Sequence, residues 1–150
     1  MKAARAIATL GGIGYVRYAP GTAGSVAALP LAWLIAQGRG QFALLLAAVL
    51  ALAIGAWASE LYTAETKQTD PCECVIDELA GQWIACSFAP VTLAGYALAF
   101  VLFRLFDIWK PWPIRAVQRW HGGFGVMADD VLAALITGGI LVVLSHFGLV

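Results

Sequence analysis

The sequence predicts an all-α fold, namely an integral membrane bundle of about five short transmembrane helices built as two hairpins and a C-terminal helix. Three observations predict it. Of the 150 residues, 61% are hydrophobic and 12% are charged, whereas about a quarter of the residues in soluble domains are charged. Four long stretches carry no charge, and turn signals interrupt the chain where hairpins need them. The length predicts a single domain over residues 1–150.

The four uncharged stretches each come close to the length of a membrane span. A helix needs about 20 apolar residues to cross about 30 Å of hydrocarbon. The stretches run over residues 18–38, 40–59, 79–103 and 131–150. A soluble helical bundle with an unusually apolar core is the alternative, and the same length rule disfavours it.

The first hairpin follows a short N-terminal segment. Residues 1–10 contain two basic residues but no long apolar core that ends in a cleavage site, so we expect no removable signal peptide. Residues 38–40, Gly-Arg-Gly, are a turn signal. They separate a helix expected over about residues 25–37 from a longer one over about residues 41–66.

The second hairpin is expected at Pro90, near the middle of the stretch 79–103. If that stretch crossed the membrane once, Asp77 and Asp107 would lie on opposite faces. A proline disfavours helix in the residue before it and removes a backbone donor. We therefore predict two short helices that turn back at Pro90, followed by a last helix from Val131.

This path places the charged residues of the chain at one membrane face. All nine acidic residues lie there, and Arg39 is the one basic residue expected on the opposite face. Such an excess of basic residues on one side predicts that this face is cytoplasmic and that the C-terminus lies outside. The basic residues on the charged face are Lys2, Arg5, Arg17, Lys67, Arg104, Lys110, Arg115 and Arg119.

The segment around residues 109–120 is expected to lie in the interface between membrane and water. Tryptophan and basic residues alternate along it, a mixture that suits the headgroup layer. These residues are Trp109, Lys110, Trp112, Arg115, Arg119 and Trp120.

Two pairs of adjacent acids precede apolar stretches, and they are the strongest candidates for chemistry. Asp77 and Glu78 come directly before residues 79–103, and Asp129 and Asp130 directly before residues 131–150. One acid at a helix start can be a cap, but that does not explain both members of a pair. Hard oxygen ligands at helix ends suit Mg²⁺, which binds through one or two carboxylates together with substrate phosphate oxygens.

Other acids and cations surround these pairs in the sequence. Asp70, Glu73 and Asp77 have the spacing of one helix face, although Asp70 and Glu73 also fit a solvated loop. Asp107 stands three residues from both Arg104 and Lys110, and either cation could neutralise a phosphate beside a metal.

The glycine-rich segment over residues 11–25 leads into the first long helix. Backbone N–H groups of such a segment can bind an anion. It lacks the Gly-Lys-Ser/Thr ending of a P-loop, and Thr22 or Ser25 fits the role of an N-cap equally well. Both interpretations remain open at this point.

Several classes of function are disfavoured by what the sequence lacks. A net charge of zero disfavours a nucleic-acid partner. Cys72, Cys74 and Cys86 contain no C-x-x-C pair, which disfavours a structural zinc site, and none of them is followed six positions later by arginine, as a cysteine-phosphatase loop would require. With two histidines, catalysis by a histidine pair is also disfavoured. A carboxylate-bound metal that activates water, or that orients a carboxylate nucleophile, remains.

At these residues the chain resembles the phosphatidylglycerophosphatase A family. Five blocks match in order: residues 8–14 (Ala-Thr-Leu-Gly-Gly-Ile-Gly); residues 19–25 (Ala-Pro-Gly-Thr-Ala-Gly-Ser); Asp70-Pro71 with residues 75–78 (Val-Ile-Asp-Glu) and Gly81-Gln82; residues 103–108 (Phe-Arg-Leu-Phe-Asp-Ile) with Lys110-Pro111 and Pro113-Ile114; and residues 122–127 (Gly-Gly-Phe-Gly-Val-Met) with Asp129-Asp130. The resemblance implies a bacterial enzyme of the cytoplasmic membrane. Such an enzyme removes the terminal phosphate of phosphatidylglycerophosphate in a Mg²⁺-dependent step of phospholipid biosynthesis.

Carried onto this chain, the resemblance implies that Asp77, Glu78, Asp129 and Asp130 serve the metal and the reaction. It also implies that Asp107 and Lys110 belong to the same polar site. The residues that we expect to lie around the phosphate are Arg17, Thr22, Arg104, Asp107 and Lys110. Two rival classes stay open. A small ion or metal transporter would place its acids near the middle of the membrane. A structural membrane subunit would tolerate amides in place of all five carboxylates of the candidate site, namely Asp77, Glu78, Asp107, Asp129 and Asp130.

Overall fold

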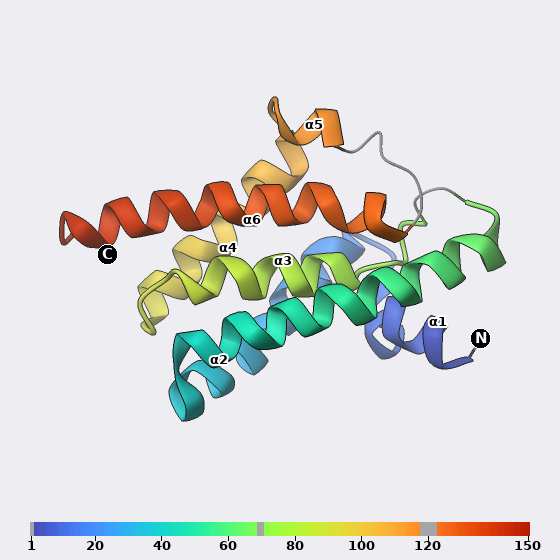
Figure 1. Ribbon diagram of the computed structural model, residues 1–150, viewed down its shortest axis with the longest axis horizontal. Helices are drawn as coiled ribbons and strands as arrows, with labels where there is room; N and C mark the ends of the chain where they lie inside the picture. Colours follow the sequence, from blue (N-terminus) through green and yellow to red (C-terminus); the bar gives the residue numbers. More distant parts are fainter. Residues whose placement is uncertain (1, 69–70, 118–122) are drawn as a thin grey trace.

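The computed structural model describes residues 2–68, 71–117 and 123–150, and within them it contains helices, turns and loops but no strand. The all-α prediction is confirmed. In chain order the elements are α1 (Lys2–Ala8), the 3₁₀ helix η1 (Leu10–Tyr15), α2 (Pro20–Thr66), α3 (Ile76–Ser87), α4 (Leu93–Trp109), α5 (Ile114–Val117) and α6 (Gly123–His146) (Figure 1).

Helix α2 is two helices that fold back on each other at Gly40. Gly40 has φ 84° and ψ 168°, a backbone conformation that glycine adopts without a steric penalty. Figure 1 shows the two arms of α2 running back from this turn. The first arm begins at Pro20, before the predicted start at residue 25, because proline is preorganised for the first position of a helix. The predicted first hairpin therefore forms.

The second hairpin turns at Pro90, as predicted, and joins α3 to α4. The Thr92 hydroxyl caps α4 by accepting a 3.0 Å hydrogen bond from the backbone N–H of Gly95. The Gln41 side-chain amide donates a hydrogen bond to the carbonyl of Ala89. This bond ties the two hairpin turns together at the end of the bundle that holds the C-terminus (Figure 1).

Small residues let the helices pack closely around α3, which contacts α2, α4 and α6. Ala28, Ala32 and Ala36 form a stripe along the first arm of α2, and each is buried. A Cβ placed on Gly81 of α3 would lie 2.7 Å from the Phe103 ring of α4. Close backbone approach through Ala and Gly is typical of helices that associate in a membrane.

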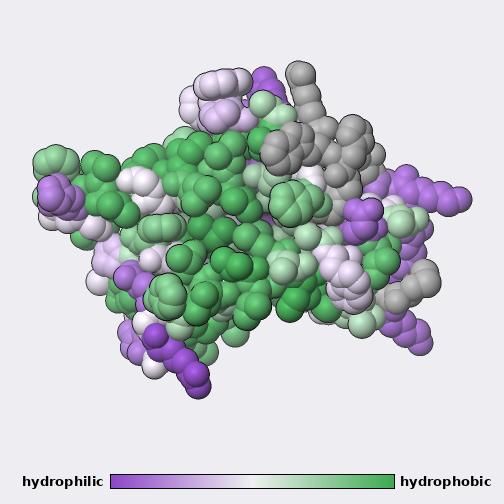
Figure 2. All heavy atoms as spheres, in the orientation of Figure 1, coloured by the Kyte–Doolittle hydropathy of each residue, from purple (hydrophilic) through white to green (hydrophobic). Residues whose placement is uncertain are grey.

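The outer surface of the bundle is strongly apolar. Leu34 of α2 is 68% exposed, Phe42 is 73% exposed and Leu50 is 63% exposed. Figure 2 shows hydrophobic residues over the middle of one face and the hydrophilic ones gathered toward its ends and over α5. By length and composition, Pro20–Thr66 and Met127–His146 are able to cross a membrane.

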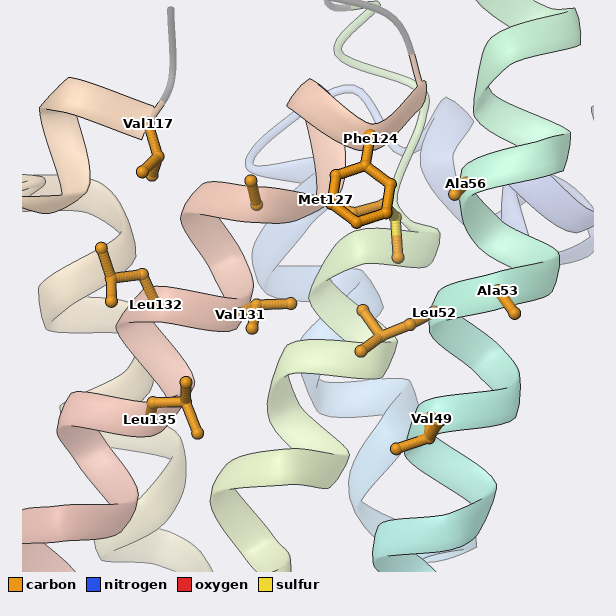
Figure 3. A pocket seen from close by; sticks show the side chains of 11 residues that line it. Val49, Leu52, Ala53, Ala56, Val117, Phe124, Met127, Val131, Leu132 and Leu135 are labelled. Carbon is orange, nitrogen blue, oxygen red and sulfur yellow. The ribbon is translucent and has the colours of Figure 1, made fainter. Parts of the chain in front are cut away.

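An apolar groove of about 490 Å³ lies between the second arm of α2 and α6. Leu52, Met127, Val131 and Leu135 are among the side chains that line it, and none of the described residues along it is charged (Figure 3). The groove belongs to the apolar outer surface, and the acids of α6 are not part of its wall.

Two expected elements differ from the structure. Helix α6 begins at Gly123, two turns before Val131, because the Met127 side chain packs tightly against Gly55 of α2 and offsets the weak helix propensity of glycine. Glu73 lies in a turn and does not share a helix face with Asp77, because α3 begins at Ile76. Asp70 lies outside the described residues.

The segment predicted to lie in the interface is described as far as residue 117. The α4 helix ends at Trp109, and the short α5 follows after a loop. Trp109 and Trp112 are 65% and 85% exposed. The remainder of the segment, with Arg119 and Trp120, lies outside the described residues.

Candidate active site

Five carboxylates gather where α3, α4 and α6 meet. Asp77 and Glu78 lie in the first turn of α3, Asp107 in the last turn of α4, and Asp129 and Asp130 in the second turn of α6. One oxygen each from Asp77, Glu78 and Asp130 lie within 4.8 Å of one another, as do oxygens from Asp107, Asp129 and Asp130. Asp130 thus belongs to both groups.

Close packing of α3 against α6 brings these groups together. A Cβ on Gly81 would lie 3.2 Å from the Asp130 carbonyl oxygen, so the two backbones approach directly one turn after Glu78. Asp129 and Asp130 sit inside α6 and not at its start, which makes the capping interpretation wrong for both. Asp77, Asp107, Asp129 and Asp130 are each 7% exposed or less.

Two cations from the end of α4 neutralise part of this charge. Arg104 Nη1 lies 2.6 Å from Asp107 Oδ2 and 3.8 Å from Glu78 Oε1. Lys110 Nζ donates a hydrogen bond to Asp129 Oδ2 and lies 3.6 Å from Asp107 Oδ1. Burial lowers the pKa of the Lys110 ammonium, but the hydrogen bond to Asp129 and the nearby carboxylate charges outweigh it and raise that pKa above its usual value. Lys110 is therefore a fixed positive charge.

The remaining negative charge has no cation to balance it among the residues that the structure describes. If all five carboxylates are ionised, Arg104 and Lys110 leave three charges uncompensated. Glu78 Oε2 and Asp130 Oδ2 are buried and accept no hydrogen bond from a described residue. Buried carboxylate oxygens without partners are costly. Their hard oxygens and their grouping fit a Mg²⁺ ion.

The start of α2 reaches the same site. A Cβ on Gly21 would overlap Glu78 Oε1 and lie 3.1 Å from Arg104 Nη2. Ala19 occupies the N-cap position without a side-chain hydrogen bond, so the N-cap interpretation of Thr22 and Ser25 is wrong. The first N–H groups of a helix have no partner within the helix. Arg104 Nε is likewise a buried donor without a partner among described residues, so both are free to bind a phosphate oxygen.

The structure does not draw every candidate residue into the cluster. The Arg17 side chain is exposed, with its guanidinium carbon 5.8 Å from the centroid of the Tyr18 ring, and no ion pair joins it to a described carboxylate. Thr22 is half-buried in the first turn of α2. The three cysteines form no disulfide with one another. No potential group of metal ligands within the described ranges contains a cysteine.

Two glycines matter for the site but were given no role of their own from the sequence, although Gly21 lies in the glycine-rich segment and Gly81 in one of the matching blocks. Gly21 and Gly81 allow a side chain and a carbonyl, respectively, to approach the helix backbone. A signal existed for Gly81, because it lies three residues after Glu78 in an otherwise apolar helix, where an isolated glycine often has a packing reason. The partner in that approach could not be read from the chain.

Comparison with known proteins gives consistent matches. The family model for phosphatidylglycerophosphatase A matches residues 6–145. A phosphatidylglycerophosphatase A of Escherichia coli K12 is 37% identical over 137 residues, which cover 90% of this chain and 79% of that protein. The phosphatidylglycerophosphatase A of Haemophilus influenzae is 37% identical over 126 residues, 83% of this chain and 77% of the relative.

A third relative carries a different name. A Bacteroides thetaiotaomicron protein, named provisionally as a phosphatidylinositol-3-phosphatase, is 37% identical over 132 residues, with 83% of this chain and 82% of the relative covered. No solved structure matches the chain.

Proposed function

The chain belongs to the phosphatidylglycerophosphatase A family, and from this membership we propose that it hydrolyses the terminal phosphomonoester of phosphatidylglycerophosphate to phosphatidylglycerol and inorganic phosphate. One observation supports this proposal most directly. Carboxylates from three helices share a buried site with unpaired oxygens, and two cations able to bind phosphate stand beside them.

We propose that the site holds Mg²⁺ through oxygens of Asp77, Glu78, Asp129 and Asp130. Asp107 adds a further negative charge beside Asp129 and Asp130. When bound, Mg²⁺ supplies a Lewis acid that withdraws charge from the phosphate oxygens. Asp130 contributes to both groups of ligands, and its free Oδ2 is the clearest sign that a cation is needed.

Around the phosphate, the residues of this chain have separable tasks. Arg104 has a free Nε donor and Lys110 a fixed positive charge, so they orient the phosphomonoester. One carboxylate of the cluster either accepts the proton of the attacking water or attacks phosphorus itself, and in the second case water then hydrolyses the phosphorylated carboxylate and releases inorganic phosphate. The bond between phosphorus and the glycerol oxygen breaks, and that oxygen takes up a proton to become the free hydroxyl of phosphatidylglycerol.

An assay of phosphate release tests the proposal. The protein is purified in detergent and offered phosphatidylglycerophosphate, phosphatidic acid, phosphatidylinositol 3-phosphate and soluble glycerol phosphate in the presence of Mg²⁺. We expect the highest kcat/KM on phosphatidylglycerophosphate. Metal flux into proteoliposomes without phosphate release from any substrate would favour the transporter and contradict the proposal.

Gly21→Ala is expected to lower kcat/KM by about a hundredfold, because displacing a catalytic carboxylate by about 1 Å has effects of this size. The added methyl group would overlap Glu78 Oε1 and force that carboxylate to move. Gly139→Ala is the matched control, since it also adds a methyl to a helix but meets nothing within 4 Å. Equal rates for the two variants would exclude the close approach of Gly21 to the site.

We also propose a multi-pass arrangement in the bacterial cytoplasmic membrane, with both arms of α2 and helices α3, α4 and α6 embedded and the acidic site facing the cytoplasm. The distribution of basic residues supports this orientation.

Cys72 is exposed, whereas Cys74 and Cys86 are buried. A membrane-impermeant maleimide is therefore expected to label Cys72 in inverted vesicles but not in intact spheroplasts. As a control, a Cys72→Ser variant that also carries Leu149→Cys should show the opposite pattern. Labelling of Cys72 in intact spheroplasts would overturn the orientation.

A further inference from the structure

A second hollow lies beside the acidic site, on the side of α4 and α5. Its volume is about 630 Å³, and Trp109, Lys110, Pro111, Trp112, Arg115 and Ala116 line it. Unlike the groove between α2 and α6, it has cationic residues, Lys110 and Arg115, among its described lining residues, and none of these lining residues is acidic. The hollow therefore suits an anion that also carries apolar or hydroxyl groups.

Arg115 provides the uncompensated charge of this hollow. Lys110 is paired with Asp129 and Asp107, so its charge is largely balanced from the acidic side. The Arg115 side chain is exposed, and it forms no ion pair with any carboxylate in the described ranges. A guanidinium in this position is suited to bind a phosphate oxygen through a charge-assisted hydrogen bond.

Lys110 connects the hollow to the acidic site. Its ammonium donates a hydrogen bond to Asp129, and the same side chain forms part of the wall of the hollow. A ligand in the hollow would thus have one end next to the carboxylate cluster. Trp109 and Trp112 line the hollow and are exposed, and exposed tryptophan in a membrane protein prefers the depth of lipid headgroups.

From this juxtaposition we infer that the hollow binds the phosphodiester of the lipid substrate, the phosphate that the reaction leaves in place, with Arg115 as its main cationic partner. The inference rests on the proposed function. Phosphatidylglycerophosphate carries two phosphates joined by a glycerol bridge, so the diester can occupy the hollow while the monoester reaches the carboxylates. Phosphatidic acid has no diester, so Arg115 favours the longer lipid over it.

Arg115→Gln tests this assignment through a comparison of two lipids. The KM for phosphatidylglycerophosphate is expected to rise about tenfold, as for the loss of one charge-assisted hydrogen bond at a partly exposed site, with kcat nearly unchanged. Kinetics on phosphatidic acid in the same micelles should not change. Arg39→Gln changes an exposed arginine next to the Gly40 turn of α2, which is not among the residues that line the hollow; it is the matched control and should leave both lipids unaffected.

A binding measurement separates this inference from the proposed function. Phosphatidylglycerol has the diester but no monoester, so its retention by the purified protein, counted by native mass spectrometry, should fall in Arg115→Gln and not in Arg39→Gln. An unchanged KM together with unchanged retention would overturn the role of Arg115, as would an equal loss on both lipids. Absence of phosphate release in the unmodified protein, with retention still dependent on Arg115, would overturn the proposed function alone.

Discussion

Replacing Asp130 with asparagine is expected to lower kcat for phosphate release by about a thousandfold, because metal-assisted charge stabilisation contributes several kcal/mol and each 1.36 kcal/mol is a factor of about ten in rate. Asp130 offers an oxygen to both groups of potential ligands, and its Oδ2 has no other partner among described residues. An amide of the same shape removes the charge and keeps the packing. The measurement is single-substrate kinetics in detergent at saturating Mg²⁺.

The metal-free stability of the same variant should not fall. The asparagine side chain would remove one buried charge that no described cation balances, so the metal-free variant should unfold at a midpoint equal to or above that of the unmodified protein. Glu60→Gln changes an exposed acid of α2 that belongs to neither group of potential metal ligands; it is the control and should keep normal turnover. A kcat for Asp130→Asn within a few-fold of normal would remove Asp130 from the site.

Removal of divalent cations is expected to abolish phosphate release completely and reversibly. EDTA should stop turnover, and added Mg²⁺ should restore it. Binding to the folded state alone also stabilises that state, by about 2.7 kcal/mol at a Mg²⁺ concentration about a hundred times the Kd. The unfolding midpoint should therefore rise with Mg²⁺ concentration, because the ion relieves repulsion among carboxylates drawn from α3, α4 and α6.

Two comparisons serve as controls for the experiment in which divalent cations are removed and added back. The Mg²⁺-dependent rise of the midpoint should be lost in Asp130→Asn and retained in Glu60→Gln. Ca²⁺ should replace Mg²⁺ poorly in turnover, because it prefers more ligands and longer bonds. Full activity in excess EDTA would contradict the assignment of the cluster as a metal site.

The hairpin turns could be predicted from the sequence because their signals are local. Glycines flank the first turn, and Pro90 marks the second, so each turn depends on the backbone preferences of a few residues. The start of α3 could not be predicted in this way. The Val75 N–H donates a 2.8 Å hydrogen bond to the carbonyl of Ala8, and Gly14 packs against the backbone of Glu73. These contacts join distant parts of the chain and hold residues 71–75 out of the helix.

In the candidate site, too, some features follow from local sequence signals and others depend on contacts between distant parts of the chain. That paired acids begin α3 and lie near the start of α6 follows from their position beside apolar stretches. The pairing of Arg104 with Asp107 also follows from a spacing of three residues. By contrast, the contact of Gly21 with Glu78 and the separation of Arg17 from the acids depend on how α2 packs, which no local pattern encodes.

The length of α3 has a further consequence for where the reaction takes place. Its 12 residues rise about 18 Å, well short of the about 30 Å of hydrocarbon in a bilayer. In the proposed orientation the Pro90 turn would lie near the outer leaflet, and Asp77 and Glu78 would lie below the level of the surrounding headgroups. The inner leaflet would then be dimpled over the enzyme, and a lipid would reach the carboxylates by sinking its phosphate into this depression, with its acyl chains never leaving the hydrocarbon.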